Sequence, residues 1–242
     1  MKKSIVFILS IFFISTFTKA QISVMPYVQG GVSALTNTPT SFLTLSSYSE
    51  SDYKPGFGYA AGLLVNYKFN KHIEIRTGIE YQNSGIRIEE RYINDPNYAT
   101  TVTYTGIGVV DRTKRQSNSI YTNIPIQFQY NFRTNKSIVP YIALGGNLGW
   151  FTKERFFTEG YLENEFVGEI SKTYNNTGNV LFAGLNLDFG IQRKINEKFS
   201  FNAFVSGDMY LARLGKYAKF GLPLQPFNVS LGLGLAYSIQ RK

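Results

Sequence analysis

The chain has 242 residues, of which 43% are hydrophobic, 16% aromatic and only 17% charged. It contains no cysteine and a single histidine, His72, which excludes disulfide frameworks, cysteine-based zinc sites and thiol catalysis and leaves little from which to build a histidine metal site. The formal net charge of +9 is compatible with nucleic acid as a partner, and the positions of the charges along the chain decide whether that interpretation holds. The 22 glycines and many aromatic residues are typical of strands that face an apolar medium.

The first residues have the pattern of a secretory signal peptide. Lys2 and Lys3 precede an apolar stretch over residues 5–14, and the small residues Thr18 and Ala20 form a cleavage site. This apolar run of about ten residues is shorter than the roughly 20 that a transmembrane helix needs. We therefore expect a signal peptide over residues 1–20, cleaved after Ala20, and a single outer-membrane β-barrel domain over residues 21–242.

Large apolar residues alternate with small or polar residues along the rest of the chain. The clearest run ends the sequence, where Phe227, Val229 and Leu231 begin a series of apolar odd positions. A period of two fits a β-strand and cannot be used by a helix. The pattern predicts eight strands, at roughly residues 24–36, 56–69, 72–82, 120–132, 138–151, 180–192, 198–210 and 227–239. Their lengths match tilted strands that cross a bilayer.

The predicted connections alternate between short and long. The short turns are residues 70–71, 133–137 and 194–198. The long connections are about residues 37–55, 90–118, 152–178 and 212–226. Outer-membrane barrels have this asymmetry, with tight turns in the periplasm and long loops outside. A soluble barrel such as a lipocalin shares the alternation with its apolar face turned inward, but the loop asymmetry and strand lengths favour the membrane form. The predicted fold is therefore all-β, an eight-stranded antiparallel up-and-down transmembrane β-barrel of a Gram-negative outer membrane.

Three segments carry a resemblance to a known family. Residues 73–81 (IEIRTGIEY) are similar to its strand with a Gly-aliphatic-x-Tyr end, residues 121–126 (YTNIPI) to its Tyr-x-x-Ile-Pro-Leu strand, and residues 141–146 (YIALGG) to the Gly-rich strand that follows. On these segments the chain resembles the PorT-like outer-membrane β-barrel family of Bacteroidetes, a porin-family group. The resemblance implies an outer-membrane barrel, and one branch of that family works in a secretion apparatus.

Charged residues are few on the predicted inner face. Glu74, Arg76, Glu80 and Asp188 fall at lumen-facing positions, with Arg76 and Asp188 at similar depth almost across the barrel. Because ionised groups away from bulk water need partners, we interpret the four as a structural salt-bridge network. A proton or ion path along the same residues is the alternative. Eight strands enclose an interior that their own side chains roughly fill, so a diffusion pore is not expected.

We assign no catalytic, cofactor-binding or metal-binding residues from the sequence. His72 lies beside the first short turn, away from the outer surface where a lipid-cleaving enzyme would need it. Aromatic residues in the third long connection, such as Phe157, Tyr161 and Phe166, suit protein or glycan recognition, and packing of the loops on one another would use them equally well. We therefore expect a non-enzymatic protein that binds a partner at the surface or takes part in assembly or secretion. A loop-side lipid- or peptide-cleaving enzyme and a small-solute channel are the alternatives.

Locating the charges changes what the positive balance means. Lys2, Lys3 and Lys19 belong to the expected signal peptide. Most of the remaining excess lies on the predicted short turns and the C-terminal end: Lys68, Lys71, Arg133, Lys136, Arg193, Lys194, Lys198, Arg241 and Lys242. A basic rim beside a membrane attracts anionic headgroups or an acidic protein. The expected partners are outer-membrane lipid and a protein bound through the long loops or this rim, and nucleic acid is not expected.

Overall fold

The computed structural model describes residues 21–35, 49–92, 102–104, 107–132, 137–175, 181–214 and 226–239. The expected signal peptide, residues 37–48 of the first predicted long connection, residues 215–225 of the fourth, and the basic residues Arg133, Lys136, Arg241 and Lys242 lie outside these ranges. Residues 49–55 and 212–214 of those two connections belong to strands. None of the described segments forms a helix with the length and apolar character needed to cross a membrane.

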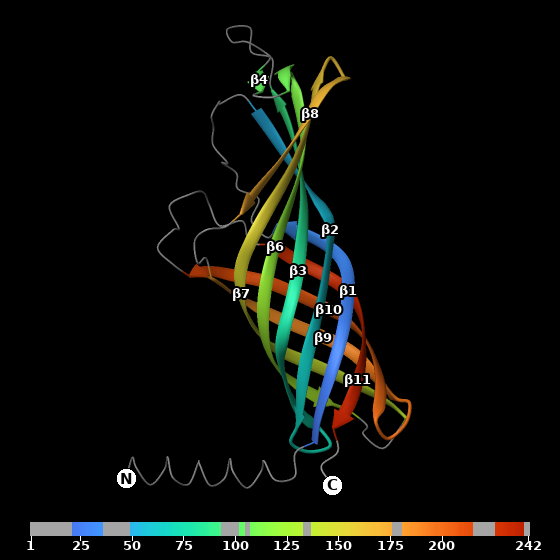
Figure 1. Ribbon diagram of the computed structural model, residues 1–242. Coiled ribbons are helices and arrows are strands. Elements are labelled where there is room, and N and C mark those ends of the chain that lie inside the picture. Colours follow the sequence, from blue (N-terminus) through green and yellow to red (C-terminus); the bar gives the residue numbers. More distant parts are fainter. Residues whose placement is uncertain are drawn as a thin grey trace, which may run out of the picture.

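Eight antiparallel strands pair in sequence order and close into a ring (Figure 1). The ring closes where the first described strand pairs with the last, with Ile22 opposite Ile239. Its members are β1 (Gln21–Leu35), β2 (Ser49–Lys68), β3 (Ile73–Tyr92), β6 (Arg112–Asn131), β7 (Ile138–Leu162), β9 (Leu181–Lys194), β10 (Phe199–Leu214) and β11 (Pro226–Ile239). The predicted fold class is confirmed, and each predicted strand overlaps one of these, although β2, β3, β6 and β7 are longer than predicted.

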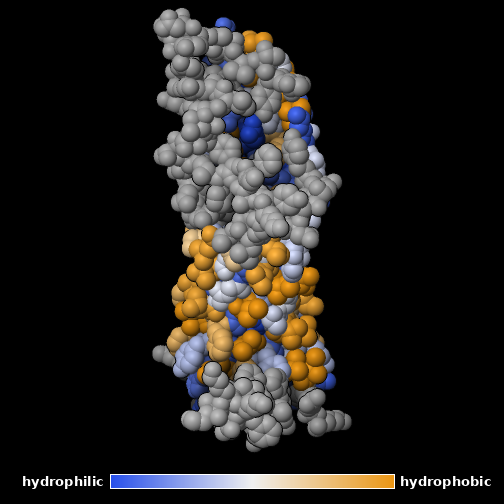
Figure 2. Space-filling model, turned by 90° about the vertical axis from the view of Figure 1, so that its left-hand side faces the viewer, coloured by the Kyte–Doolittle hydropathy of each residue, from blue (hydrophilic) through white to orange (hydrophobic). Residues whose placement is uncertain are grey.

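The apolar face of each strand points outward. Leu231 is 70% exposed and Phe57 64%, whereas the polar residues between such positions are buried in the ring, as with Ser206 at 1%. On the face drawn in Figure 2, these apolar residues form an orange band across the barrel wall. A soluble barrel would bury its apolar face, so this orientation decides between the two forms of barrel in favour of a lipid-facing wall.

Two of the short turns are held by an asparagine side chain. Asn70 Oδ1 accepts hydrogen bonds from the backbone N–H groups of His72 and Ile73, at 2.8 and 2.9 Å. Asn196 does the same after β9, accepting from the N–H groups of Lys198 and Phe199 at 2.9 and 2.8 Å. The described basic residues of the predicted rim lie at this end of the barrel: Lys68, Lys71, Arg193, Lys194 and Lys198.

Four wall strands continue past the ring at its other end and form a twisted projecting sheet (Figure 1). The sheet consists of the distal parts of β2, β3, β6 and β7 together with β8 (Glu165–Asn175), and the short pair β4 (Val102–Tyr104) and β5 (Gly108–Val110) lies near it. The predicted connections 90–118 and 152–178 are therefore largely strands and not loops. Beyond the lipid these strands are rich in charged and small polar residues. Loops have the same composition, so the strands could not be recognised from it.

The register changes where the ring gives way to the projecting sheet. One shift lies between Pro55 and Tyr59 of β2 and another between Ile120 and Tyr121 of β6. Such bulges bend a strand and increase its local twist. They let four strands leave the curved wall while the hydrogen-bonded pairing between neighbouring strands continues. Pro55 lies beside such a bulge, a position where a strand tolerates a residue without a backbone N–H.

The narrow wall leaves no room for a side chain at Gly31. A Cβ there would overlap the backbone carbonyl oxygen of Val229 on β11, whereas at the neighbouring Gly30, on the outer side, the nearest atom would be a Phe57 ring carbon at 3.5 Å. We expect Gly31→Ala to cost about 1–3 kcal/mol through overpacking. Gly30→Ala is the matched control and should leave stability nearly unchanged. The measurement is the temperature at which the compact, fast-migrating form is lost on unboiled gels; equal behaviour of the two variants would contradict the close approach of β1 and β11.

Candidate functional site

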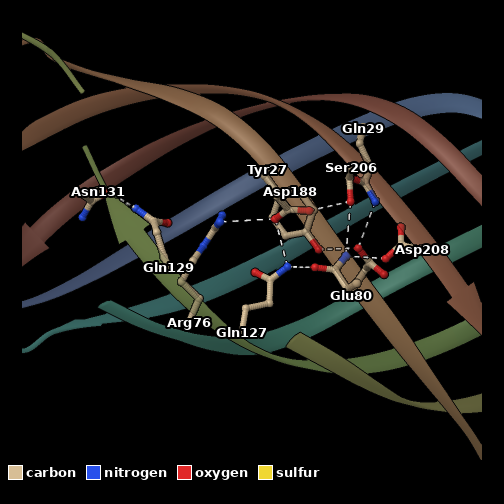
Figure 3. Close-up of polar contacts among 11 residues, drawn as sticks. Tyr27, Gln29, Arg76, Glu80, Gln127, Gln129, Asn131, Asp188, Ser206 and Asp208 are labelled. Atoms are coloured by element: carbon tan, nitrogen blue, oxygen red, sulfur yellow. Dashed lines mark hydrogen bonds and ion pairs between the residues drawn. The ribbon is translucent and has the colours of Figure 1, made fainter. Parts of the chain in front are cut away.

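The charged centre of the lumen is an ion pair between two strands separated by β6 and β7. Arg76 on β3 is 1% exposed, and its Nη1 lies 3.3 Å from Oδ2 of Asp188 on β9. Gln127 Nε2 donates to the same oxygen, and Ser206 Oγ donates to the other (Figure 3). The Arg76 guanidinium also lies 5.3 Å from the centroid of the Tyr141 ring. The arrangement thus surrounds one buried charge pair with neutral partners.

Glu74 lies outside that ion pair, near the short-turn end. Its Oε1 accepts a hydrogen bond from Asn131 Nδ2 at 2.8 Å and lies 3.4 Å from Lys68 Nζ. Gln129 Nε2 in turn donates to Asn131 Oδ1. Lys68 is directly opposite Glu74 in the pairing of β2 with β3, so the nearest cation comes from the neighbouring strand.

Two further carboxylates are held by neutral donors. Glu80 accepts hydrogen bonds from the side chains of Tyr27, Gln29 and Asn123. Asp208 accepts from the side-chain amides of Asn147 and Asn186. Within the described part of the chain neither carboxylate forms an ion pair. The sequence analysis did not assign these asparagines and glutamines as partners of the lumen carboxylates. The signal was present, because they alternate with the apolar residues of each strand and so face the lumen.

Rings and aliphatic side chains close the lumen on both sides of this polar layer. Tyr121 stacks on Tyr210 at 4.9 Å between centroids and meets Phe182 edge-on at 5.5 Å, toward the projecting sheet. Toward the short turns the lumen is filled by Met25, Tyr27, Leu64, Tyr141, Ala143, Phe204 and Ala236. The void beside Arg76 and Glu80 has a volume of about 10 Å³, the size of one water molecule. The described lumen is therefore sealed.

The end of the projecting sheet is a tight hairpin with an apolar surface. Glu163 and Asn164 connect β7 and β8 with positive φ angles of 53° and 72°, as a two-residue turn of this hand requires. The Glu163 N–H donates to Asp111 Oδ2 at 2.8 Å, which ties the turn to the residue that joins β5 and β6. Val109, Phe166 and Val167 are 44%, 58% and 42% exposed. We call these three residues the apolar tip.

The two faces of the projecting sheet differ in chemistry. The face that continues the lumen buries Glu154, whose pKa is raised by burial and is pulled back by hydrogen bonds from serines such as Ser117. On the outward face, Lys54 Nζ lies 2.7 Å from Glu89 Oε2, and this hydrogen bond lowers the pKa of Glu89. Among the described residues, no group of histidine, aspartate and glutamate side chains is placed to hold a metal ion.

The Arg76–Asp188 pair makes a direct prediction about stability. Arg76→Met leaves the Asp188 charge buried without its cation, and we expect a loss of about 3–5 kcal/mol in the free energy of unfolding. Lys54→Met is the matched control, because its ion pair with Glu89 is exposed to solvent and such pairs contribute little to stability. Urea unfolding in lipid vesicles measures both. If Arg76→Met cost no more than Lys54→Met, the ion pair would not be a structural element.

Comparison with known proteins agrees with this architecture. No curated protein matches the chain. Among solved structures it is similar to the N-terminal β-barrel domain of OprF from Pseudomonas aeruginosa, with 14% identity over 91% of this chain and 100% of that chain and a TM-score of 0.39. It is also similar to Neisserial surface protein A, with 12% identity over 89% of this chain and 97% of that chain and a TM-score of 0.40. A third similar structure is the attachment invasion locus protein Ail of Yersinia pestis, with 15% identity over 91% of this chain and 97% of that chain and a TM-score of 0.34. The model of the outer membrane protein beta-barrel domain matches residues 20–242, and the chain belongs to that family of outer-membrane proteins.

Proposed function

We propose that the chain is a non-enzymatic outer-membrane protein whose projecting sheet holds a binding surface away from the membrane, as a surface-binding protein or as a component of an assembly or secretion apparatus. The observation that carries the proposal is the continuation of four wall strands into a paired sheet that ends in the apolar tip. Exposed apolar residues above a polar stem are typical of protein contact surfaces. A sheet presents such residues in a fixed arrangement, which lowers the entropy lost on binding.

The proposal includes the orientation and processing of the chain. The signal peptide is cleaved after Ala20, the short turns with their basic residues face the periplasm, and the projecting sheet faces the medium. The resemblance to the PorT-like family of Bacteroidetes supports an apparatus-associated role, since one branch of that family works in secretion. The proposal therefore places a protein partner at the apolar tip and lipid around the wall.

Polar substitutions at the apolar tip test the binding surface. We expect the pair Phe166→Ser and Val167→Ser to reduce recovery of a co-purifying protein at least tenfold after mild crosslinking in intact outer membranes, because the contact loses two buried apolar side chains. Ile195→Ser is the matched control, since Ile195 is 59% exposed at the opposite end of the barrel. Loss of the partner in the control and not in the tip variant would move the binding surface to the periplasmic side.

A bilayer recording separates this role from that of a channel. Because aromatic and polar side chains seal the described lumen, we expect no sustained conductance when the purified protein is inserted in planar bilayers at neutral pH. A proton-leak assay in vesicles with a pH gradient should likewise show no protein-dependent decay. Stable unitary currents, or a leak abolished by Asp188→Asn, would establish a solute or proton path and contradict the sealed lumen.

A further inference from the structure

Among the described residues, unpaired cations gather where the outward face of the projecting sheet leaves the ring; this face continues the lipid-facing side of β2, β3, β6 and β7. Lys153 and Arg155 are the first charged residues on this face of β7, three and five residues beyond Trp150. Lys54 and Arg87 lie opposite each other on β2 and β3. Within the described residues, this part of the outward face nearest the ring has cations and no acid.

Acids begin one outward position farther from the ring. The next cross-strand row pairs Asp52 with Glu89, Glu89 with Lys114 and Lys114 with Glu159. Lys54 reaches up to this row, with Nζ 3.2 Å from Asp52 Oδ2 and 2.7 Å from Glu89 Oε2. No described carboxylate pairs with Arg87, Lys153 or Arg155. Three membrane-proximal cations are therefore available for an external anion.

A hollow of about 370 Å³ lies beside Arg87, which is the one of these three cations in its lining. The lining also includes Lys54, Lys114 and the ring of Phe157, with the carboxylates of Glu89 and Glu159 on its outer side. The volume falls within the range of small-molecule sites. Basic side chains around an aromatic surface suit a phosphorylated sugar, because the cations bind phosphate oxygens while the ring packs against the apolar face of the sugar.

The position of the cations along β7 sets their level relative to the membrane. Trp150 is 38% exposed on the lipid-facing wall, and tryptophan concentrates at the membrane–water interface. At about 3.3 Å per residue, Lys153 lies about 10 Å and Arg155 about 16 Å farther along the strand, and less in height if the strand is tilted. The polar headgroup layer is about 5–8 Å thick on each side of a bilayer, and sugars extend it. Lys153 therefore lies closest to the headgroup phosphates, and Arg155 faces laterally into the sugars that extend this layer.

We infer that this outward face binds the phosphorylated sugar headgroup of an outer-leaflet glycolipid, with Arg87, Lys153 and Arg155 as its phosphate ligands. Farther from the ring the face carries both signs, because Arg91 and Arg112 pair with Glu89 beyond the row of acids. The unpaired cations Arg87, Lys153 and Arg155 lie on the membrane side of that row, where a glycolipid reaches them from the side, within the leaflet. Their level next to the membrane thus favours a lipid over a soluble ligand.

The single tryptophan of the chain provides a local probe of this site. The full protein is placed in nanodiscs of brominated phosphatidylcholine, which quenches Trp150, and bisphosphorylated lipid A without bromine is added in increasing fraction. We expect phosphorylated lipid A to restore Trp150 fluorescence at a lower mole fraction than lipid A whose phosphates have been removed. The mole fraction needed should fall about fivefold for each cation that binds a phosphate. The triple variant Arg87→Gln, Lys153→Gln and Arg155→Gln should lose this preference.

A matched control separates this site from a general attraction of the barrel to anionic lipid. The control variant Arg193→Gln, Lys194→Gln and Lys198→Gln removes three cations at the opposite end of the barrel and should retain the preference, and compact migration on unboiled gels shows that each variant is folded. Equal recovery with phosphorylated and dephosphorylated lipid A, or a preference that survives in the first triple variant, would overturn the inference. So would binding of a soluble sulfated oligosaccharide in neutral nanodiscs that the first triple variant abolishes while lipid A shows no preference.

Discussion

Closure of the ring by β1 and β11 is the constraint on which the rest of the molecule depends. In a bilayer every backbone N–H and C=O needs a partner within the protein, and an antiparallel wall meets this need only when its last strand returns to its first. Eight strands close around a narrow space. That space requires a glycine at Gly31, where the backbone of β11 approaches, and it leaves almost no volume for water. The carboxylates of the lumen must therefore find donors among the side chains.

The lumen satisfies this requirement mainly with neutral amides and hydroxyls. Asp188 has one cation, Arg76, and also accepts hydrogen bonds from Gln127 and Ser206. Glu80 has three neutral donors and no described cation. Distributing the donors in this way keeps the polar layer continuous across strands on different sides of the ring. The polar layer connects strands that are not paired through their backbones, and it therefore stabilises the ring from inside.

The wall strands could be predicted from the sequence because lipid imposes a strict alternation on every one of them. Phe227, Val229 and Leu231 predicted both a strand and its outward face. Partners within the lumen were harder to predict, because they depend on register. Glu80 lies four residues from Arg76, about 13 Å along a strand, and it accepts a hydrogen bond from Tyr27 on β1, two strands away. Glu74 is nearer, yet its cation is its cross-strand neighbour Lys68. The projecting sheet was missed because no lipid enforces hydrophobic alternation beyond the membrane.

The projecting sheet rises from only four neighbouring strands of the ring, β2, β3, β6 and β7. Among the described residues, the protein therefore extends beyond the wall on one side of the ring and lacks rotational symmetry about the membrane normal. A membrane protein that approaches along β2, β3, β6 and β7 contacts the projecting sheet as well as the lipid-facing wall. On that side a neighbour is bound both within the bilayer and above it.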